Sequence, residues 1–257
     1  MAGVYSFLPI GLRVLNKIEN IIRKHMDTIG TEVFLPCLSP TENWETTQRI
    51  DSVDVLMKTS WANDASYQKC TNQYILNPTH QDVITPLVQQ YVSSYKDLPV
   101  SVYQIQSKFR NEARAKSGLL RGREFRMKDL YSFHASDEDF VSFYNKSKEV
   151  YANIFEELWL GDSTYLTVAS GGDFTEKNSH EFQTVCDAGE DVIYIDASSG
   201  IAYNQEVAPS QTPDYDYSTE MWEIEDIYGE NIVSVAKLCE FLKLPIEQTV
   251  KTMLYKD

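Results

Sequence analysis

Two charged side chains near the middle of the chain have types and spacing suited to binding a phosphorylated ligand. Arg110 and Glu112 lie two positions apart in a stretch with strand character, so both side chains should lie on the same face. The arginine fork can bind a phosphate through two hydrogen bonds, and the carboxylate can accept from an exocyclic amine. Phe125, after a glycine-bearing loop, can stack on a base. The loop adds three cations: Arg114, Lys116 and Arg121.

The charge of this segment differs from that of the rest of the chain. Residues 108–128 contain eight basic and two acidic residues, whereas residues 187–230 contain twelve acidic residues and no Lys or Arg. The net charge of −15 argues against a dedicated nucleic-acid-binding protein. A polyanionic ligand should nevertheless be attracted to the first segment and repelled by the second.

The elements that must position these residues form a hairpin with helices around it. Residues 102–112 and 123–134 are strand-like and are joined by a polar loop, 113–122. Apolar spacing predicts helices over 11–29, 80–95, 136–159 and 231–243, the third beginning at Ser136 with Asp139 three residues later. Short strands are predicted over 31–36, 73–76, 165–169, 180–186, 192–196 and from 248. The stretch 41–71 shows no clear pattern. This mixture predicts an α+β fold with an antiparallel sheet flanked by helices.

Composition excludes several classes of protein. The chain has 257 residues, 42% of them apolar and 24% charged, which is typical of a globular protein. Its four cysteines lie far apart without a CxxC pair, so we expect a reducing cytoplasmic environment, no structural zinc and no metal-ligating residues. No apolar run approaches the roughly 18 residues of a membrane span. Neither GxGxxG nor GxxxxGK[ST] occurs, so any nucleotide must bind in another way.

The hairpin also carries a family resemblance. FRNE followed by LLRGREF resembles motif 2 of class II aminoacyl-tRNA synthetases, and the run SVYQIQSKFRNEARAKSGLLRGREFRMKDLYSFH resembles the bacterial-type prolyl-tRNA synthetases. Three further stretches agree in order and spacing: residues 5–40 with motif 1, NPTHQDVIT with the amine-binding segment, and SGG…SHEF…AGED with the strands beyond the hairpin. The resemblance extends from residue 3 to about residue 208.

This resemblance implies ATP-dependent activation of proline and transfer of proline to tRNA-Pro, with Mg²⁺. Arg110 would bind the α-phosphate of ATP and the substrate carboxylate, and Arg121 would reach the γ-phosphate side. Glu112 would recognise the adenine amine, and Phe125 would stack on the ring. The proline carboxylate would attack the α-phosphorus and release pyrophosphate, a step that needs positioning and charge neutralisation rather than a side-chain nucleophile.

The resemblance also implies a site for proline. Thr79 would hold the α-amine together with Gln81, which stands where the family usually has Glu. Because glutamine cannot neutralise an ammonium, either Asp82 substitutes or proline binds more weakly. The small apolar wall would consist of Met127, Tyr131, His180 and Phe182.

The resemblance further implies how the chain is organised. Residues 1–208 would form the catalytic core with motifs 1 and 2, 209–221 a linker, and 222–257 the truncated start of an insertion domain of the editing type. We expect motif 3 and the anticodon-binding domain to be absent, so the chain would be the N-terminal portion of such an enzyme. We also expect a cytoplasmic homodimer that forms through motif 1 and does not bind membranes.

Simpler interpretations stay open at this point. Arg110 and Glu112 could form a surface ion pair worth about 0–1 kcal/mol. Thr79 could only cap the following helix. The remaining pocket candidates could be ordinary core residues: His180, Met127 and Phe182. At the level of function, the alternatives are a synthetase-like paralogue that binds an amino acid or adenylate without charging tRNA, and a non-catalytic dimerisation module.

Overall fold

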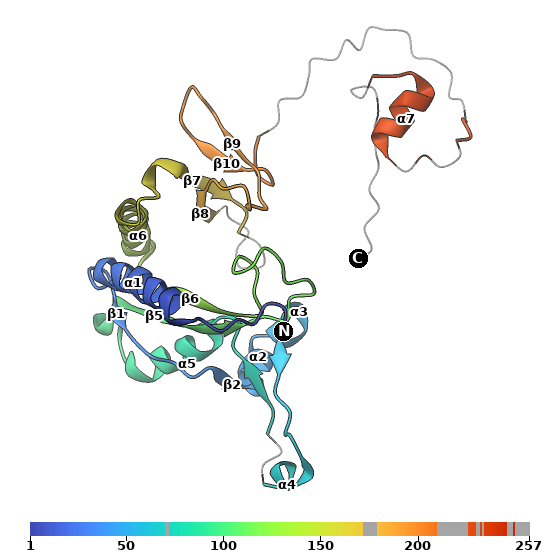
Figure 1. Cartoon of the computed structure of the whole chain (residues 1–257). Coiled ribbons are helices and arrows are strands. Elements are labelled where there is room, and N and C mark those ends of the chain that lie inside the picture. The colour runs from blue at the N-terminus through green and yellow to red at the C-terminus, as the bar shows by residue number, and fades with distance from the viewer. Residues whose placement is uncertain are drawn as a thin grey trace. The chain divides into compact units, whose positions relative to one another are not determined.

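The computed structural model describes residues 1–69, 72–171, 179–209, 226–229, 232, 234–245 and 249. The chain divides into two compact units, Met1–Pro209 and Ser210–Asp257. In the first unit, helices combine with sheets of three, four and three strands (Figure 1). This mixture confirms the α+β class that the sequence predicts.

A long antiparallel hairpin forms the centre of the first unit. Strand β5 (Val100–Phe109) pairs with β6 (Glu124–Phe133) along its whole length, from Val100 opposite Phe133 to Phe109 opposite Glu124. Strand β1 (Thr31–Glu32) adds to β5 in parallel. The hairpin is as predicted, but β5 ends at Phe109. Arg110 and Glu112 therefore lie in the loop, and the expectation that strand alternation orients them is wrong.

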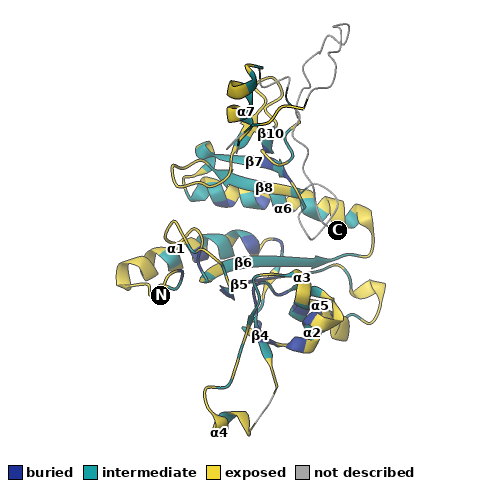
Figure 2. Ribbon diagram, turned by 90° about the vertical axis from the view of Figure 1, so that its right-hand side faces the viewer, coloured by how far each residue is buried: buried dark blue, intermediate teal, exposed yellow. Residues whose placement is uncertain are grey.

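Helices cover both faces of the hairpin (Figure 2). Helices α1 (Pro9–Met26) and α6 (Asp137–Glu157) bury one face, and their apolar core includes Met26, Tyr103, Ile105 and Ile154. Helix α5 (Gln81–Tyr91) buries the other face through Ile84 and Val88. Helix α6 begins where the sequence predicts: its N-cap is Ser136, whose Oγ accepts a hydrogen bond from the Asp139 N–H at 3.3 Å.

A four-stranded sheet lies beyond α6 in the order β8-β7-β10-β9. Its strands are β7 (Thr164–Ala169), β8 (Ser179–Thr184), β9 (Ile193–Ile195) and β10 (Ala202–Asn204). Phe182 of β8 stacks on Phe155 of α6 at 5.4 Å between ring centroids, which joins the sheet to the helix. The sequence predicts strands at β7, β8 and β9 but not at β10.

The stretch without a sequence pattern folds into short elements. They are α2 (Thr41–Thr46), α3 (Arg49–Ser52), β3 (Met57–Lys58) and α4 (Asp64–Tyr67). Strand β2 (Leu38–Pro40) precedes this stretch, and β4 (Tyr74–Leu76), which the sequence predicts, follows it and lies between β2 and β3 in a sheet. Two single 3₁₀ turns, Tyr95–Asp97 and Gly161–Ser163, complete the unit. The predicted strand 31–36 is shortened to β1, because Leu35 bonds the Gln106 side chain instead of a strand backbone.

In the second unit, the described residues form helix α7 (Val235–Leu242). Its N-cap is Ser234, whose Oγ accepts from the Lys237 N–H at 3.2 Å. This helix corresponds to the predicted helix 231–243. The predicted strand from 248 and most of the predicted linker 209–221 lie outside the described residues. Within the described part of the chain, no helix combines the length and the hydropathy that crossing a membrane requires.

Candidate functional site

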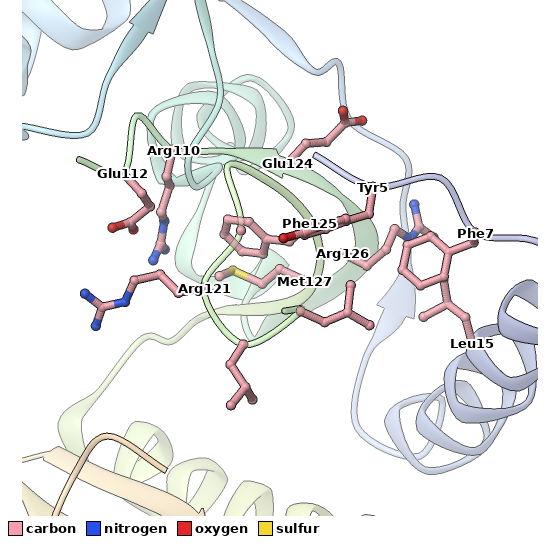
Figure 3. Close-up of a pocket in the computed structure, with 13 residues that line it drawn as sticks. Tyr5, Phe7, Leu15, Arg110, Glu112, Arg121, Glu124, Phe125, Arg126 and Met127 are labelled. Carbon is pink, nitrogen blue, oxygen red and sulfur yellow. The ribbon is translucent and has the colours of Figure 1, made fainter. Parts of the chain in front are cut away.

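A pocket of about 680 Å³ lies at the loop end of the hairpin. Each residue predicted to hold the nucleotide lines it: Arg110, Glu112, Arg121 and Phe125. In Figure 3 the first three lie on one side of Phe125, and Tyr5 and Phe7 from the N-terminal segment lie on the other. The structure therefore brings together a phosphate-binding fork, a carboxylate and aromatic rings, which can hold a phosphorylated base.

The N-terminal segment crosses the hairpin and fixes this end of it. The Gly3 carbonyl accepts from the backbone N–H groups of Arg123 at 2.6 Å and of Glu124 at 3.1 Å. Gly3 has φ +77°, and a Cβ there would lie 2.9 Å from the Arg123 backbone nitrogen, so the crossing requires glycine. The Arg123 side chain donates to the Glu112 carbonyl at 3.0 Å and thereby holds the start of the loop.

Arg110 is positioned by its backbone and by an aromatic ring. Its N–H donates to the Arg123 carbonyl at 2.9 Å, and its guanidinium carbon lies 5.4 Å from the Phe125 ring centroid. Such cation–π contacts hold the guanidinium plane near a ring. The ion pairs of the described residues do not include one between Arg110 and Glu112, so the simpler surface-pair interpretation receives no support.

Two loop cations are tied to the acidic segment. Arg121 Nη2 lies 2.8 Å and Lys116 Nζ 3.3 Å from the carboxylate of Glu190. The same two basic residues form an isolated antiparallel bridge with each other. Glu190 therefore occupies the position next to Arg121 in which an anionic group of a ligand would bind.

A second pocket, of about 450 Å³, adjoins the first at Arg110. Its lining includes Thr79 and Gln81 from the predicted amine-binding segment, and Arg49 and Asp54 from the stretch without a pattern. The Asn111 N–H donates to the Val55 carbonyl at 2.8 Å and fastens that stretch beside the hairpin. Arg110 is the residue common to both pockets, so one guanidinium can contact ligands in each.

The structure gives no support to Asp82 as a replacement for the missing carboxylate. Its side chain is 1% exposed and lies 2.6 Å from Arg49 Nη1, and Asp82 is not among the residues that line the second pocket. Thr47 Oγ1 donates to its other oxygen at 2.8 Å. Gln81 is the residue that lines the pocket, and the Thr79 hydroxyl donates to its side-chain oxygen. Thr79 does not cap helix α5, whose N-cap residue is His80.

The four residues predicted to form the apolar wall are not gathered in one place. Met127 lines the first pocket. Tyr131 lines neither of these two pockets, and its hydroxyl accepts from the His80 N–H at 3.0 Å. His180 packs against Tyr144 of α6, with Nδ1 3.0 Å from the hydroxyl oxygen, and burial and Lys148 lower its pKa. Phe182 packs on Phe155. Phe182 is half-buried against α6, as the core alternative expects, whereas His180 is exposed and fits neither the pocket wall nor the core alternative.

Several residues of the two pockets escaped prediction. Arg49 and Asp54 belong to the stretch 41–71, whose short elements have no periodic pattern to place them. Tyr5 and Phe7 fall within the motif 1 resemblance, but nothing in the sequence indicates that they reach the hairpin. Among the residues that the structure describes, no group of three or more His, Cys, Asp and Glu could hold a metal ion.

Comparison with known proteins places these features in a family. Residues 64–248 match the tRNA synthetase class II core domain (G, H, P, S and T). The chain is 44% identical over 265 residues to a proline--tRNA ligase of Sulfurihydrogenibium sp., and 40% identical over 257 residues to one of Listeria monocytogenes. Each alignment covers 99% of this chain and 44% of the relative, so the chain spans less than half the length of these relatives.

Solved structures share the fold. A Giardia lamblia prolyl-tRNA synthetase in complex with prolyl-adenylate aligns with a TM-score of 0.61 and 22% identity, over 68% of this chain and 35% of that one. A Cryptosporidium parvum prolyl-tRNA synthetase complexed with L-proline and AMP aligns with a TM-score of 0.57 and 16% identity, over 67% and 33%.

Proposed function

This chain belongs to the class II tRNA synthetase core family (G, H, P, S and T), and we propose that it is the N-terminal part of a bacterial-type proline--tRNA ligase. In this proposal the whole enzyme activates proline with ATP and transfers it to tRNA-Pro. The observation that carries the proposal is the position of Arg110, which lines two adjoining pockets. An adenylate-forming site must hold a carboxylate and an α-phosphate next to each other, and a shared arginine provides for both.

The first pocket would hold ATP. We assign the adenine ring to the space beside Phe125, with Glu112 accepting from its amine and Arg121 binding the outer phosphates in place of Glu190. Because the described residues form no metal cluster, Mg²⁺ would enter with the nucleotide and be held mainly by its phosphates, as this ion commonly is.

The second pocket would hold proline. The carboxylate would lie on Arg110, and the amine would face Thr79 and Gln81. The carboxylate oxygen then attacks the α-phosphorus, the bond from that phosphorus to the β-phosphate oxygen breaks, and pyrophosphate leaves. Arg110 neutralises charge that develops between the two substrates, so its loss should cost about 3–4 kcal/mol of transition-state stabilisation.

We further propose a cytoplasmic homodimer. Ile10, Val14 and Ile18 recur at four-residue spacing on α1 and are 81%, 52% and 36% exposed. Phe34, next to β1, is 84% exposed. An apolar strip outside the core suits burial against a second copy of the chain.

A second candidate function is supported by Gln81. The residue in the amine-binding position carries no negative charge, and Asp82 is committed to Arg49. A paralogue that binds an amino acid or adenylate without charging tRNA would tolerate this weaker recognition of the amine.

Binding and exchange measurements on this chain test the proposal. A non-hydrolysable prolyl-adenylate analogue should bind at least about tenfold more tightly than the glycyl analogue, because apolar contacts to the ring distinguish the two. Arg110→Ala should reduce that affinity about 100-fold or more, whereas Arg13→Ala on the exposed side of α1 should leave it unchanged.

Proline-dependent ATP–pyrophosphate exchange would support the ligase, and binding without exchange would support the paralogue. Equal binding of the two analogues would contradict both.

A further inference from the structure

A buried layer of polar side chains lies on the hairpin face that α5 covers. Lys108 is completely buried, and its Nζ lies 2.5 Å from Oδ2 of Asp129. That oxygen also accepts from Gln104 Nε2 at 3.1 Å and from the Tyr131 hydroxyl at 2.9 Å. Burial by itself would raise the pKa of Asp129, but the charge of Lys108 and the three hydrogen bonds outweigh it and lower the pKa. Burial also lowers the pKa of Lys108, and the neighbouring Asp129 opposes that shift, so each member of the pair favours the charged form of the other although water does not reach Lys108.

His80 connects this ion pair to the segment before helix α5. The Lys108 ammonium contacts Nδ1 of His80, and Nε2 of the same ring lies 3.0 Å from the Pro36 carbonyl oxygen. Because an ammonium can only donate, Nδ1 is the acceptor and the ring proton lies on Nε2, facing Pro36. Burial and the neighbouring Lys108 lower the pKa of His80 to about 4, which keeps this neutral form at physiological pH.

The backbone of His80 is held as firmly as its ring. Its N–H donates to the Tyr131 hydroxyl at 3.0 Å, and its carbonyl accepts from the N–H groups of Val83 at 3.1 Å and Ile84 at 2.8 Å. The ring points inward and is completely buried. The residues on either side, 79 and 81, line the second pocket. The orientation of the pocket wall thus depends on how His80 is held.

We propose that the Lys108–Asp129 ion pair is a positioning device for the amine-binding segment, residues 79–81. Acting through the ring of His80 and the hydroxyl of Tyr131, it fixes the orientation in which the segment meets the amine of the amino acid. Replacing a buried ion pair by apolar residues is often neutral or stabilising, so stability alone is a weak reason to retain one. The proposal rests on the proposed function for the identity of the ligand, and on the contacts above for the mechanical connection.

The mildest test removes one hydroxyl. Tyr131→Phe keeps the ring and the ion pair but breaks the connection between Asp129 and the His80 backbone. Tyr103→Phe is the matched control, since this buried tyrosine on the opposite face also donates to an aspartate, Asp27, at 2.6 Å. Isothermal titration of this chain should show proline affinity reduced about fivefold or more in Tyr131→Phe, with ATP affinity within about twofold. The control should leave both affinities unchanged.

Either of two titration results would overturn the proposal: unchanged proline affinity in Tyr131→Phe, or equal losses of affinity for proline and ATP. Failure of the wild-type chain to bind proline would count against the proposed function instead. Hydrogen exchange of the unliganded chain then decides the mechanical connection. The peptide covering residues 77–84 should exchange faster in Tyr131→Phe and not in Tyr103→Phe. The same exchange rate in wild type and Tyr131→Phe would refute positioning by this network.

Discussion

The position of Arg110 between two pockets determines what the residue can do. A guanidinium carries five N–H donors in a fixed plane, so it can serve a carboxylate on one side and a phosphate on the other. Its backbone is fixed by Arg123 and its side chain by the ring of Phe125. A lysine could supply the positive charge but could not donate hydrogen bonds in the two directions. Arg110→Lys should therefore lose almost as much affinity for the prolyl-adenylate analogue as Arg110→Ala.

Gln81 provides a test of how the amine is recognised. Gln81→Glu places a carboxylate where the second pocket now has a neutral amide, and a charge-assisted hydrogen bond is roughly twice as strong as a neutral one. Proline affinity should therefore increase about five- to tenfold, measured by isothermal titration calorimetry at pH 7.

Gln90→Glu is the matched control for this substitution. It makes the same chemical change on an exposed position of α5 and should not alter proline affinity. Unchanged or weaker proline binding in Gln81→Glu would show that the amine does not lie against this residue.

Lys128 provides a test of pH dependence. Burial lowers its pKa from the ordinary 10.5 to about 8, and its Nζ lies 4.2 Å from the ring centroid of Tyr151. Between these two pH values the unfolded chain binds more protons, so the contribution of Lys128 to the free energy of unfolding is unfavourable below pH 8 and improves as pH rises towards 10.5. Lys128→Met should therefore raise the free energy of unfolding at pH 7 by about 1–2 kcal/mol.

Urea unfolding at pH 7, 8, 9 and 10 measures this effect. The advantage of Lys128→Met over wild type should shrink across the series. Lys146→Met, on an exposed position of α6, should show no such trend. An advantage that stays constant with pH would exclude titration of Lys128 as its cause.

At the scale of elements, the sequence predicts the helices and strands that are long enough to show periodic spacing of apolar residues. The hairpin and the helices α1, α5 and α6 are long enough to show apolar spacing or a glycine-bearing turn, and the structure has all of them. The alternation in β5 is misleading, however. Gln104, Gln106 and Lys108 have the polar spacing of a solvent-facing row, yet they are 0%, 2% and 0% exposed. Both faces of this strand are covered. Gln104 and Lys108 contact Asp129, and Gln106 bonds the Leu35 backbone, which are tertiary partners that a local pattern cannot reveal.

The candidate site likewise contains some residues that the sequence predicts and others that it does not. The sequence predicts Arg110, Glu112 and Phe125 because they are close together along one hairpin. Arg49 and Asp54 reach the site from short elements whose placement depends on long-range contacts, such as the bond from Asn111 to Val55. No spacing rule relates segments that are brought together only by folding.

The backbone of one residue in the turn before α3 has a strained conformation, and a substitution can test this strain. Gln48 has φ 57°, in the left-handed region that costs a non-glycine residue roughly 1–2 kcal/mol. Gln48→Gly should remove that strain, partly offset by the greater freedom of glycine in the unfolded chain, for a net gain of about 0.5–1 kcal/mol. Thermal unfolding should show this gain as a higher midpoint temperature.

Gln68→Gly is the matched control, because Gln68 has φ −64° at the end of α4. There glycine relieves nothing and should lower the midpoint. If both substitutions lower it, the conformation of Gln48 is not strained in solution.

At the scale of the whole molecule, the net charge does not reveal that basic and acidic residues are concentrated in different segments. The net charge is −15, while the hairpin segment 108–128 is strongly basic and lines the pocket assigned to ATP. Glu190, from the acidic segment, forms ion pairs with Lys116 and Arg121 of the basic loop. A negative total therefore does not exclude an anionic substrate when one pocket concentrates the cations.

The apolar strip on α1 leads to a prediction about assembly. Ile10 is 81% exposed and Phe34 84%, although the opposite side of α1 is buried through Met26. If a second copy of the chain covers this strip, an aspartate at its centre would have to be desolvated without a partner in the dimer. Ile10→Asp should therefore convert a dimer to a monomer, as measured by sedimentation equilibrium over micromolar concentrations. Because position 10 lies in the first turn of α1, an acidic residue there favours the helix and should not unfold it.

Ile201→Asp provides the control, since it makes the same substitution at a position that is 45% exposed and lies outside the strip. The dimer should persist in this variant, which separates a contact at α1 from a general effect of added negative charge. A wild-type chain that is monomeric throughout the concentration range, or an equal effect of both substitutions, would count against this interface. If instead only Ile10→Asp dissociates the dimer, helix α1 has two apolar sides with separate partners, one within its own core and one on a second copy of the chain.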